Sequence, residues 1–199
     1  MADPPERRLS RLIVALLSHL TPAFDRPYAF FGHSMGALIA FELARALRRT
    51  PAPGLQHLFV SAHRAPSIAG RRRYHQLDDR ELRRVLRRIG GSPDAVLAHD
   101  ELMDLLLPTV RADFELCETY RYAAAAPLDV PITVFAGNED SEVSSGDLDG
   151  WRHESLTGVD IHVLEGGHFF LDEARDHVLS SIAAALGVAA SGRSGGRAT

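Results

Sequence analysis

The chain has 199 residues, of which 45% are hydrophobic and 24% are charged, a profile typical of one globular domain with a sizeable core. Its formal net charge of -4 argues against a nucleic-acid-binding surface over the whole chain. The single cysteine, Cys117, excludes an intramolecular disulfide and favours a reducing compartment. No run of about 20 apolar residues is present to span a bilayer. We therefore expect a soluble, cytoplasmic protein without nucleic-acid or membrane partners.

The elements expected near the N-terminus are a helix, a strand and a second helix. Apolar residues at helical spacing predict an amphipathic helix over residues 9–20. Residues 28–31 form a short apolar run, stopped by Gly32, that predicts a buried strand. Strong helix formers follow at once, from residue 35 to about residue 49. This order places Ser34 in a tight turn between a strand and a helix.

Three more short apolar segments, bounded by turn residues, predict strands at residues 58–62, 132–136 and 161–164. Such runs are typical of parallel strands that are covered on both faces. Between the first and second of these segments, residues 71–126 form a helical insertion that is much longer than a crossover requires. We interpret this insertion as a lid. A last helix is expected over residues 171–186.

Two features inside the insertion predict where its helices begin and bend. Asp78 and Glu81 are spaced as in a capping box, which indicates a helix start. A longer helical stretch, about residues 100–122, contains Pro108, and this proline should kink or break it. The sequence thus predicts several helices in the insertion.

The composition changes at the C-terminal end of the chain. Residues 188–199 are rich in Gly, Ser, Ala and Arg and are expected to form a disordered tail. The remaining residues, 9–187, are predicted to be a single α/β domain. In this domain a mostly parallel sheet is flanked by helices and carries the insertion.

Ser34 lies in the sequence Gly32-His33-Ser34-Met35-Gly36. A serine hydroxyl becomes a good nucleophile only when a base removes its proton. A strained strand-to-helix turn, with glycines two residues before and after the serine, exposes that hydroxyl to a substrate. The amide of Met35 would lie at a helix N-terminus, where it can stabilise an oxyanion. We therefore predict Ser34 as a nucleophile and His33 as a pocket residue.

The partners of such a serine follow it in the chain order acid, then histidine, at the ends of later strands. Asp140 follows the third predicted strand, and we prefer it over Glu139 because the shorter carboxylate more usually orients the histidine. Glu142 and Asp147 are weaker alternatives. His168 follows the fourth predicted strand in a glycine-containing turn and is the predicted general base.

Three segments of the sequence resemble the type II thioesterases, the discrete editing enzymes of modular polyketide and nonribosomal peptide synthases. They are residues 28–37 around Ser34, residues 107–114 (LPTVRADF) with 118–120, and residues 166–171 (GGHFFL). The resemblance implies an α/β-hydrolase fold in which the lid shapes a tunnel for the substrate. It also implies hydrolysis of stalled or wrongly primed acyl groups from the phosphopantetheine arm of acyl or peptidyl carrier protein domains.

Carried over position by position, the resemblance implies a role for each of the three predicted residues. Ser34 would take the acyl group from the thioester substrate. His168 would act first as a base and then activate water, while Asp140 would hold His168. The chain needs no cofactor of its own in this mechanism, because the partner brings the phosphopantetheine.

The family that the chain resembles has more strands before the nucleophile than this sequence has before Ser34. We therefore expect an N-terminally truncated form of the fold. In α/β-hydrolases a loop after an earlier strand supplies the second oxyanion amide, and no equivalent loop precedes Ser34. Loss of one such donor costs on the order of a hundredfold to a thousandfold in rate, and a missing strand exposes a sheet edge.

A local basic patch in the insertion has two interpretations. Its members are Arg71, Arg72, Arg73, Arg83, Arg84, Arg87 and Arg88. One interpretation is a docking surface for acidic carrier domains, and the other is a solvated helix face. Two alternative functions also stay open, namely a general carboxylesterase or acyltransferase with the same triad, and an inactive fragment that only binds carrier domains.

Overall fold

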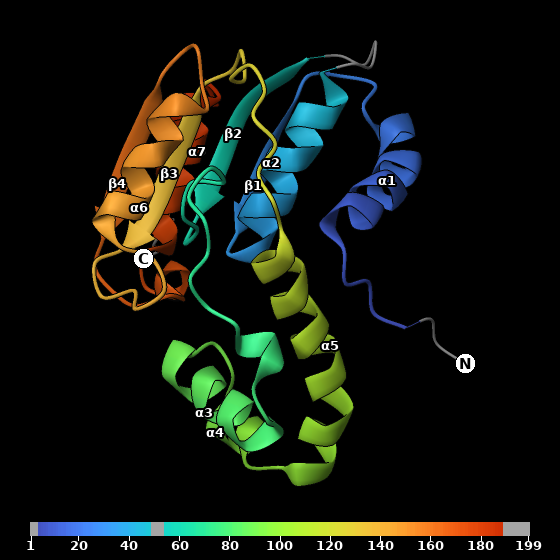
Figure 1. The fold of residues 1–199 in the computed structure, drawn as a ribbon. Coiled ribbons are helices and arrows are strands. Elements are labelled where there is room, and N and C mark those ends of the chain that lie inside the picture. The colour runs from blue at the N-terminus through green and yellow to red at the C-terminus, as the bar shows by residue number, and fades with distance from the viewer. Residues whose placement is uncertain (1–3, 49–53, 189–199) are drawn as a thin grey trace, which may run out of the picture.

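A four-stranded sheet forms the centre of the computed structural model, which describes residues 4–48 and 54–188. The sheet has the order β1-β2-β3-β4, and each neighbouring pair is parallel. The strands are β1 (Tyr28–His33), β2 (Leu55–Ser61), β3 (Ile132–Gly137) and β4 (Val159–Leu164). The predicted parallel α/β sheet is therefore confirmed, and its strands end on the side that faces helices α3 to α5 (Figure 1).

Helices surround this sheet within the described residues. The α-helices are α1 (Leu9–Leu20), α2 (Met35–Leu47), α3 (Asp79–Ile89), α4 (Asp94–Leu97), α5 (Asp100–Thr119), α6 (Ser145–Asp149) and α7 (Arg175–Ala185). Short 3₁₀ helices lie at Thr21–Ala23, Tyr74–Gln76, Gly150–His153 and Phe170–Asp172. The predicted last helix begins too early, because a 3₁₀ turn precedes α7. The predicted end of the second helix, at residue 49, lies outside the described residues.

The two faces of the sheet are covered by different helices, as the alternation of side chains along a strand requires. Leu58 and Val60 of β2 pack against α2 and against the fully buried Trp151, which follows α6. Phe59, between them in sequence, faces the opposite layer with Val178 of α7. Figure 1 shows the same three-layer arrangement, with α7 behind the strands.

Helices α3, α4 and α5 connect β2 to β3 and have a hydrophobic core of their own. Leu82 and Val85 of α3 pack with Leu97 of α4 and with Met103 and Leu107 of α5. The part of α5 that follows this core runs back to the sheet layer, where it packs against α1 and α2. We call the segment that contains α3, α4 and α5 the helical insert, and it lies beyond the carboxyl ends of the strands (Figure 1).

The helix α5 continues through Pro108 as one element of 20 residues. Of the predicted kink or break, the break is therefore wrong, and the kink stays a prediction. A proline inside a helix removes one backbone hydrogen bond. Met103 and Leu107 before the proline and Ala112 and Leu116 after it are all buried. Packing on both sides therefore holds the helix together across a residue that opposes it.

Strand β1 lies at one edge of the described sheet. This position agrees with the sequence-based expectation of an exposed sheet edge. The prediction of β1 as a buried strand is wrong, because most of its residues are only half-buried and Phe31 is 43% exposed. The predicted C-terminal tail lies, apart from Val188, outside the described residues. In the part of the chain that the structure describes, no helix has the length and apolar character to cross a membrane.

Candidate active site

Ser34 occupies a strained turn between β1 and α2. Its backbone angles are φ 52° and ψ -120°, a region that residues other than glycine rarely adopt. The Ser34 amide donates to the Ser61 carbonyl over 2.8 Å, and the Ser34 carbonyl accepts from Ala37 over 3.0 Å. These two bonds, one to β2 and one within α2, hold the turn in place. Backbone strain of this kind is typical of a functional site.

The two glycines of the turn have different roles. A Cβ atom added to Gly32 would lie 2.1 Å from the carbonyl oxygen of Gly36, so only glycine fits where β1 meets α2. A Cβ atom added to Gly36 would meet nothing within 4 Å. Glycine is therefore required at position 32, because the backbone of residue 36 occupies the space that a side chain at position 32 would need.

The three residues predicted to act together are in hydrogen-bond contact. His168 Nε2 lies 2.9 Å from Ser34 Oγ, and His168 Nδ1 lies 2.8 Å from Asp140 Oδ2. The Asp140 side chain is fully buried and that of His168 is 7% exposed. Since a carboxylate only accepts hydrogen bonds, Nδ1 carries the proton and leaves Nε2 free to accept the serine proton.

Asp140 and His168 come from turns that follow adjacent strands, β3 and β4, and these turns are hydrogen-bonded to each other. The Glu139 amide donates to the Gly166 carbonyl over 2.9 Å, and the Gly166 amide donates to Asn138 Oδ1 over 3.1 Å. A Cβ atom on Gly137, at the end of β3, would lie 2.3 Å from the Gly166 carbonyl oxygen. Sequence reasoning missed Asn138 and Gly137, since their contacts join segments nearly thirty residues apart.

The other carboxylates considered for the triad have different partners. Glu139 is exposed. Asp147 forms a capping box with Ser144 at the start of α6, in which Asp147 Oδ2 accepts from the amide and the hydroxyl of Ser144. The Glu142 carboxylate accepts from Tyr74. Among these four carboxylates, Asp140 alone contacts His168 in the described residues.

Met35, the predicted oxyanion donor, is the first residue of α2. The first amides of a helix have no partner within the helix, and they carry the partial positive charge of its dipole. The Met35 amide is therefore one of the groups that can donate to an anion formed beside Ser34. Its role in the oxyanion hole remains a prediction.

Two further histidines near the site are held in the neutral form. Burial, and secondarily the neighbouring His168, lowers the pKa of His33 to about 4, and the two rings lie 5.4 Å apart. A neutral His33 does not oppose a positive charge on His168. Burial and the adjacent Arg64 likewise lower the pKa of His63 to about 4. His63 follows β2 and donates from Nδ1 to the Arg64 carbonyl over 2.7 Å.

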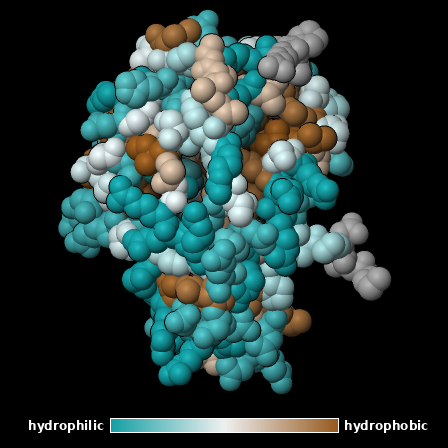
Figure 2. Space-filling model, in the orientation of Figure 1, coloured by the Kyte–Doolittle hydropathy of each residue, from teal (hydrophilic) through white to brown (hydrophobic). Residues whose placement is uncertain are grey.

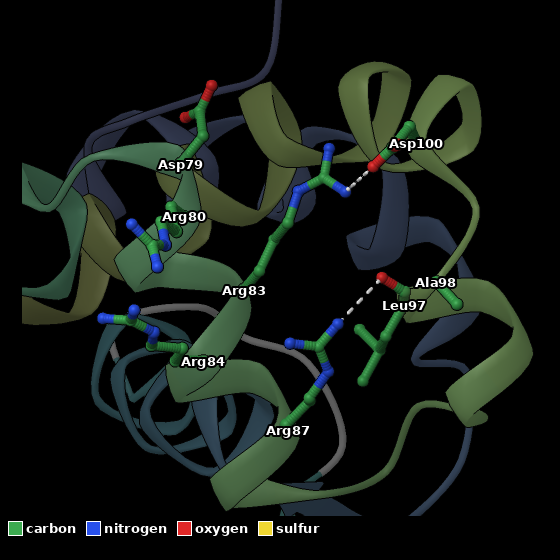
Figure 3. Close-up of a pocket in the computed structure, with 8 residues that line it drawn as sticks. All are labelled: Asp79, Arg80, Arg83, Arg84, Arg87, Leu97, Ala98 and Asp100. Carbon is green, nitrogen blue, oxygen red and sulfur yellow. Dashed lines mark hydrogen bonds and ion pairs between the residues drawn. The ribbon is translucent and has the colours of Figure 1, made fainter.

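The basic patch predicted in the insertion is partly neutralised. Arg83 pairs with Asp100 over 2.7 Å and with Asp104 over 2.9 Å, and Figure 3 shows the first of these pairs beside α3. Arg71 and Arg84 of the patch have no hydrogen bond or ion pair within the described residues, and neither has Arg80, which lies one turn before Arg84 on α3. The face of the insert seen in Figure 2 is mostly hydrophilic. On α3, Arg84 of the predicted patch and Arg80, which the prediction did not include, are therefore two arginines without a partner among the described residues.

Residues 2–186 match the family model described as "Thioesterase domain". The chain is 39% identical over 175 residues to the gramicidin S biosynthesis protein GrsT of Aneurinibacillus migulanus, and the match covers 87% of this chain and 68% of GrsT.

Solved structures of thioesterases are also similar to the chain. The RedJ thioesterase of the prodiginine pathway in Streptomyces coelicolor has a TM-score of 0.80 at 38% identity, covering 92% of this chain and 69% of RedJ. The type II thioesterase BorB of the borrelidin cluster has a TM-score of 0.84 at 35% identity, covering 92% of this chain and 75% of BorB. About a quarter to a third of each of these proteins has no counterpart in this chain.

Proposed function

The chain belongs to the thioesterase domain family, and from this premise we propose that it is an editing thioesterase of the type II class. Its proposed substrates are stalled or wrongly primed acyl groups on the phosphopantetheine arm of acyl or peptidyl carrier domains. The reaction proceeds through an acyl-Ser34 intermediate. The observation that carries the proposal is the hydrogen-bond chain from Ser34 Oγ through His168 to Asp140.

Acylation begins when His168 Nε2 takes the proton of Ser34 Oγ and the oxygen attacks the thioester carbonyl carbon. The carbonyl oxygen becomes an oxyanion, which the Met35 amide at the start of α2 stabilises. Collapse of this intermediate breaks the carbon–sulfur bond, and His168 returns the proton to the leaving thiol. Asp140 stabilises the imidazolium that exists between these two steps.

Deacylation repeats the same proton transfers with water. His168 Nε2 removes a proton from water, whose oxygen attacks the ester carbon of acyl-Ser34. The second intermediate releases a free acid and restores the Ser34 hydroxyl with the proton from His168. The two steps together need a nucleophile, a base and an orienting acid. The chain supplies all three, and in our proposal no cofactor of its own takes part.

The names of the similar proteins support a role in polyketide or nonribosomal peptide synthesis. GrsT is named for gramicidin S biosynthesis, RedJ for the prodiginine pathway and BorB for the borrelidin cluster. Carrier domains are the proposed partners of the chain on this basis.

The decisive experiment compares the protein with its Ser34→Ala variant. We expect a fluorophosphonate probe to label Ser34 in the folded protein, and acyl-loaded carrier domains to be hydrolysed. Ser34→Ala should abolish labelling and lower kcat by about six orders of magnitude, as loss of a serine nucleophile does in other triad enzymes. Circular dichroism should show an unchanged fold.

The alternative functions give different results in the same experiment. Faster turnover of simple esters than of carrier-bound thioesters, or acyl transfer to an added acceptor, would favour a general carboxylesterase or acyltransferase. Binding of carrier domains by folded protein that the probe does not label would favour an inactive carrier-binding fragment. Hydrolysis retained by Ser34→Ala would contradict the mechanism.

A further inference from the structure

Glu142 joins the helical insert to the acid of the triad. Its backbone amide donates to Asp140 Oδ1 over 2.8 Å, while Asp140 Oδ2 faces His168. The two oxygens of Asp140 are therefore held by different groups, one from its own turn and one from the histidine. A change in the position of Glu142 moves the group that fixes the orientation of the Asp140 carboxylate.

The side chain of Glu142 points to the helical insert. Tyr74 Oη donates to the carboxylate and lies 3.1 Å from each of its oxygens. Arg88 of α3 donates both to Tyr74 Oη over 2.6 Å and to Glu142 Oε1 over 3.2 Å. The Glu142 side chain is only 13% exposed, so these bonds are less screened than those of a surface pair.

The arrangement around Tyr74 fixes its ring as well as its hydroxyl group. The guanidinium groups of Arg72 and Arg88 lie 5.8 Å and 5.6 Å from the ring centroid, within the range of cation–π attraction. Burial, together with the Glu142 carboxylate, raises the pKa of Tyr74, so the hydroxyl stays protonated and donates. Arg72 also donates to the Ser141 carbonyl over 3.3 Å.

Tyr74 is anchored to the insert on its other side. Its amide donates to Glu118 Oε1 of α5 over 2.6 Å, and Glu118 is buried. Phe114 of α5 packs edge-on against the Tyr74 ring at 5.3 Å. A continuous series of contacts thus leads from α5 through Tyr74 and Glu142 to Asp140.

A second contact joins the insert to the histidine turn. A Cβ atom added to Gly91, which follows α3, would lie 2.3 Å from the ring of Phe169. Phe169 is the residue after His168, and the two rings lie 5.1 Å apart. The insert therefore contacts both turns that carry the partners of Ser34.

We infer that Glu142 is a positioning residue, which fixes Asp140 through its main chain and the insert through its carboxylate. The position of the helical insert is then coupled to the orientation of the Asp140 carboxylate. The inference rests on the proposed function because Asp140 is taken as the triad acid. From its sequence position Glu142 is only an alternative triad acid, whereas its contacts assign it this second role.

The test measures how fast a fluorophosphonate labels Ser34, which reports the triad without any carrier domain. Glu142→Ala should lower the labelling rate constant about tenfold to a hundredfold, the range that small displacements in an active site produce. Tyr74→Phe removes only the hydroxyl and should lower it severalfold. Glu142→Gln keeps an acceptor for Tyr74 and should recover part of the loss. Glu139→Gln, an equal charge change on an exposed side chain of the same turn, is the matched control.

A merely structural role is separated from positioning by repeating the variants with Asp140→Asn. If Glu142 acts through Asp140, Glu142→Ala should have no further effect in that background. Multiplicative losses, or an effect of Glu142→Ala no larger than that of Glu139→Gln, would overturn the inference.

A second measurement does not depend on activity. The proton on His168 Nδ1, bound to Asp140, should give a downfield NMR signal that Asp140→Asn abolishes. Tyr74→Phe and Glu142→Ala should shift or broaden this signal, and an unchanged signal in both would contradict the inference even if the wild-type protein did not label. Labelling without hydrolysis of carrier-bound thioesters would instead overturn the proposed function and leave the inference intact.

Discussion

At the scale of single residues, the shape of the nucleophile turn depends on the absence of a Cβ atom at Gly32. The backbone of Gly36 occupies the space that a Cβ atom at Gly32 would need. Ser34, halfway between these glycines, has a positive φ that the local hydrogen bonds must hold. Crowding at position 32 therefore acts directly on the residue that carries the proposed chemistry.

Gly32→Ala and Gly36→Ala form a matched pair that tests this asymmetry. Gly32→Ala should lower the free energy of unfolding by about 3 kcal/mol or more, because the backbone must move to relieve the overlap. Gly36→Ala should leave it unchanged or raise it by up to about 1 kcal/mol, because alanine favours a helix more than glycine does. Urea unfolding of both variants measures the difference, and equal destabilisation would contradict the steric argument.

The residues that the sequence could identify are those marked by a local pattern. Ser34, Asp140 and His168 each follow a short apolar strand in a turn, and parallel strands bring such turns together. Glu142 and Tyr74 contact each other across 68 residues of sequence, and no pattern around either residue indicates that contact. Long-range side-chain contacts of this kind determine how the triad is supported, and they could not be predicted.

At the scale of elements, sequence reasoning found the four strands and the main helices but misjudged places where packing opposes local preference. Of the kink or break that local preference predicts at Pro108, the break does not occur, because α5 is continuous there. The apolar sequence of β1 predicts a buried strand, yet β1 lies at an edge of the sheet and is mostly half-buried. In both places the tertiary contacts of the element, which its own sequence does not contain, decide the outcome.

The proline in α5 gives a prediction at this scale. Pro108 is exposed, so Pro108→Ala loses little packing and gives the helix back one backbone donor. The free energy of unfolding should rise by about 1–3 kcal/mol. Thr109→Ala, at the exposed neighbouring position, should raise it by only a few tenths of a kcal/mol. Denaturant unfolding and amide exchange along α5 measure both, and a loss of stability in Pro108→Ala would show that α5 needs the proline for its packing.

At the scale of the whole molecule, the distribution of charge bears on how a partner would dock. The net charge of the chain is -4, whereas Arg80 and Arg84 on α3 are free of acidic partners within the described residues. Arg83, from the same helix, is neutralised by Asp100 and Asp104. A carrier domain with an acidic surface would be attracted to Arg80 and Arg84, although the net charge of the whole chain is negative.

Reversing the charges of Arg80 and Arg84 tests whether this face takes part in docking. The double variant Arg80→Glu, Arg84→Glu should raise KM for an acyl-loaded carrier domain about tenfold, equivalent to about 1.4 kcal/mol, with kcat unchanged. Hydrolysis of a small soluble thioester should stay the same, because that substrate does not use the patch. Arg11→Glu with Arg175→Glu changes the net charge equally on exposed residues of α1 and α7, and should have a much smaller effect on KM.

Added salt should raise KM for the wild-type protein and reduce the difference between the two double variants. Equal effects of the two double variants would mean that α3 is a solvated helix face and that only the total charge matters.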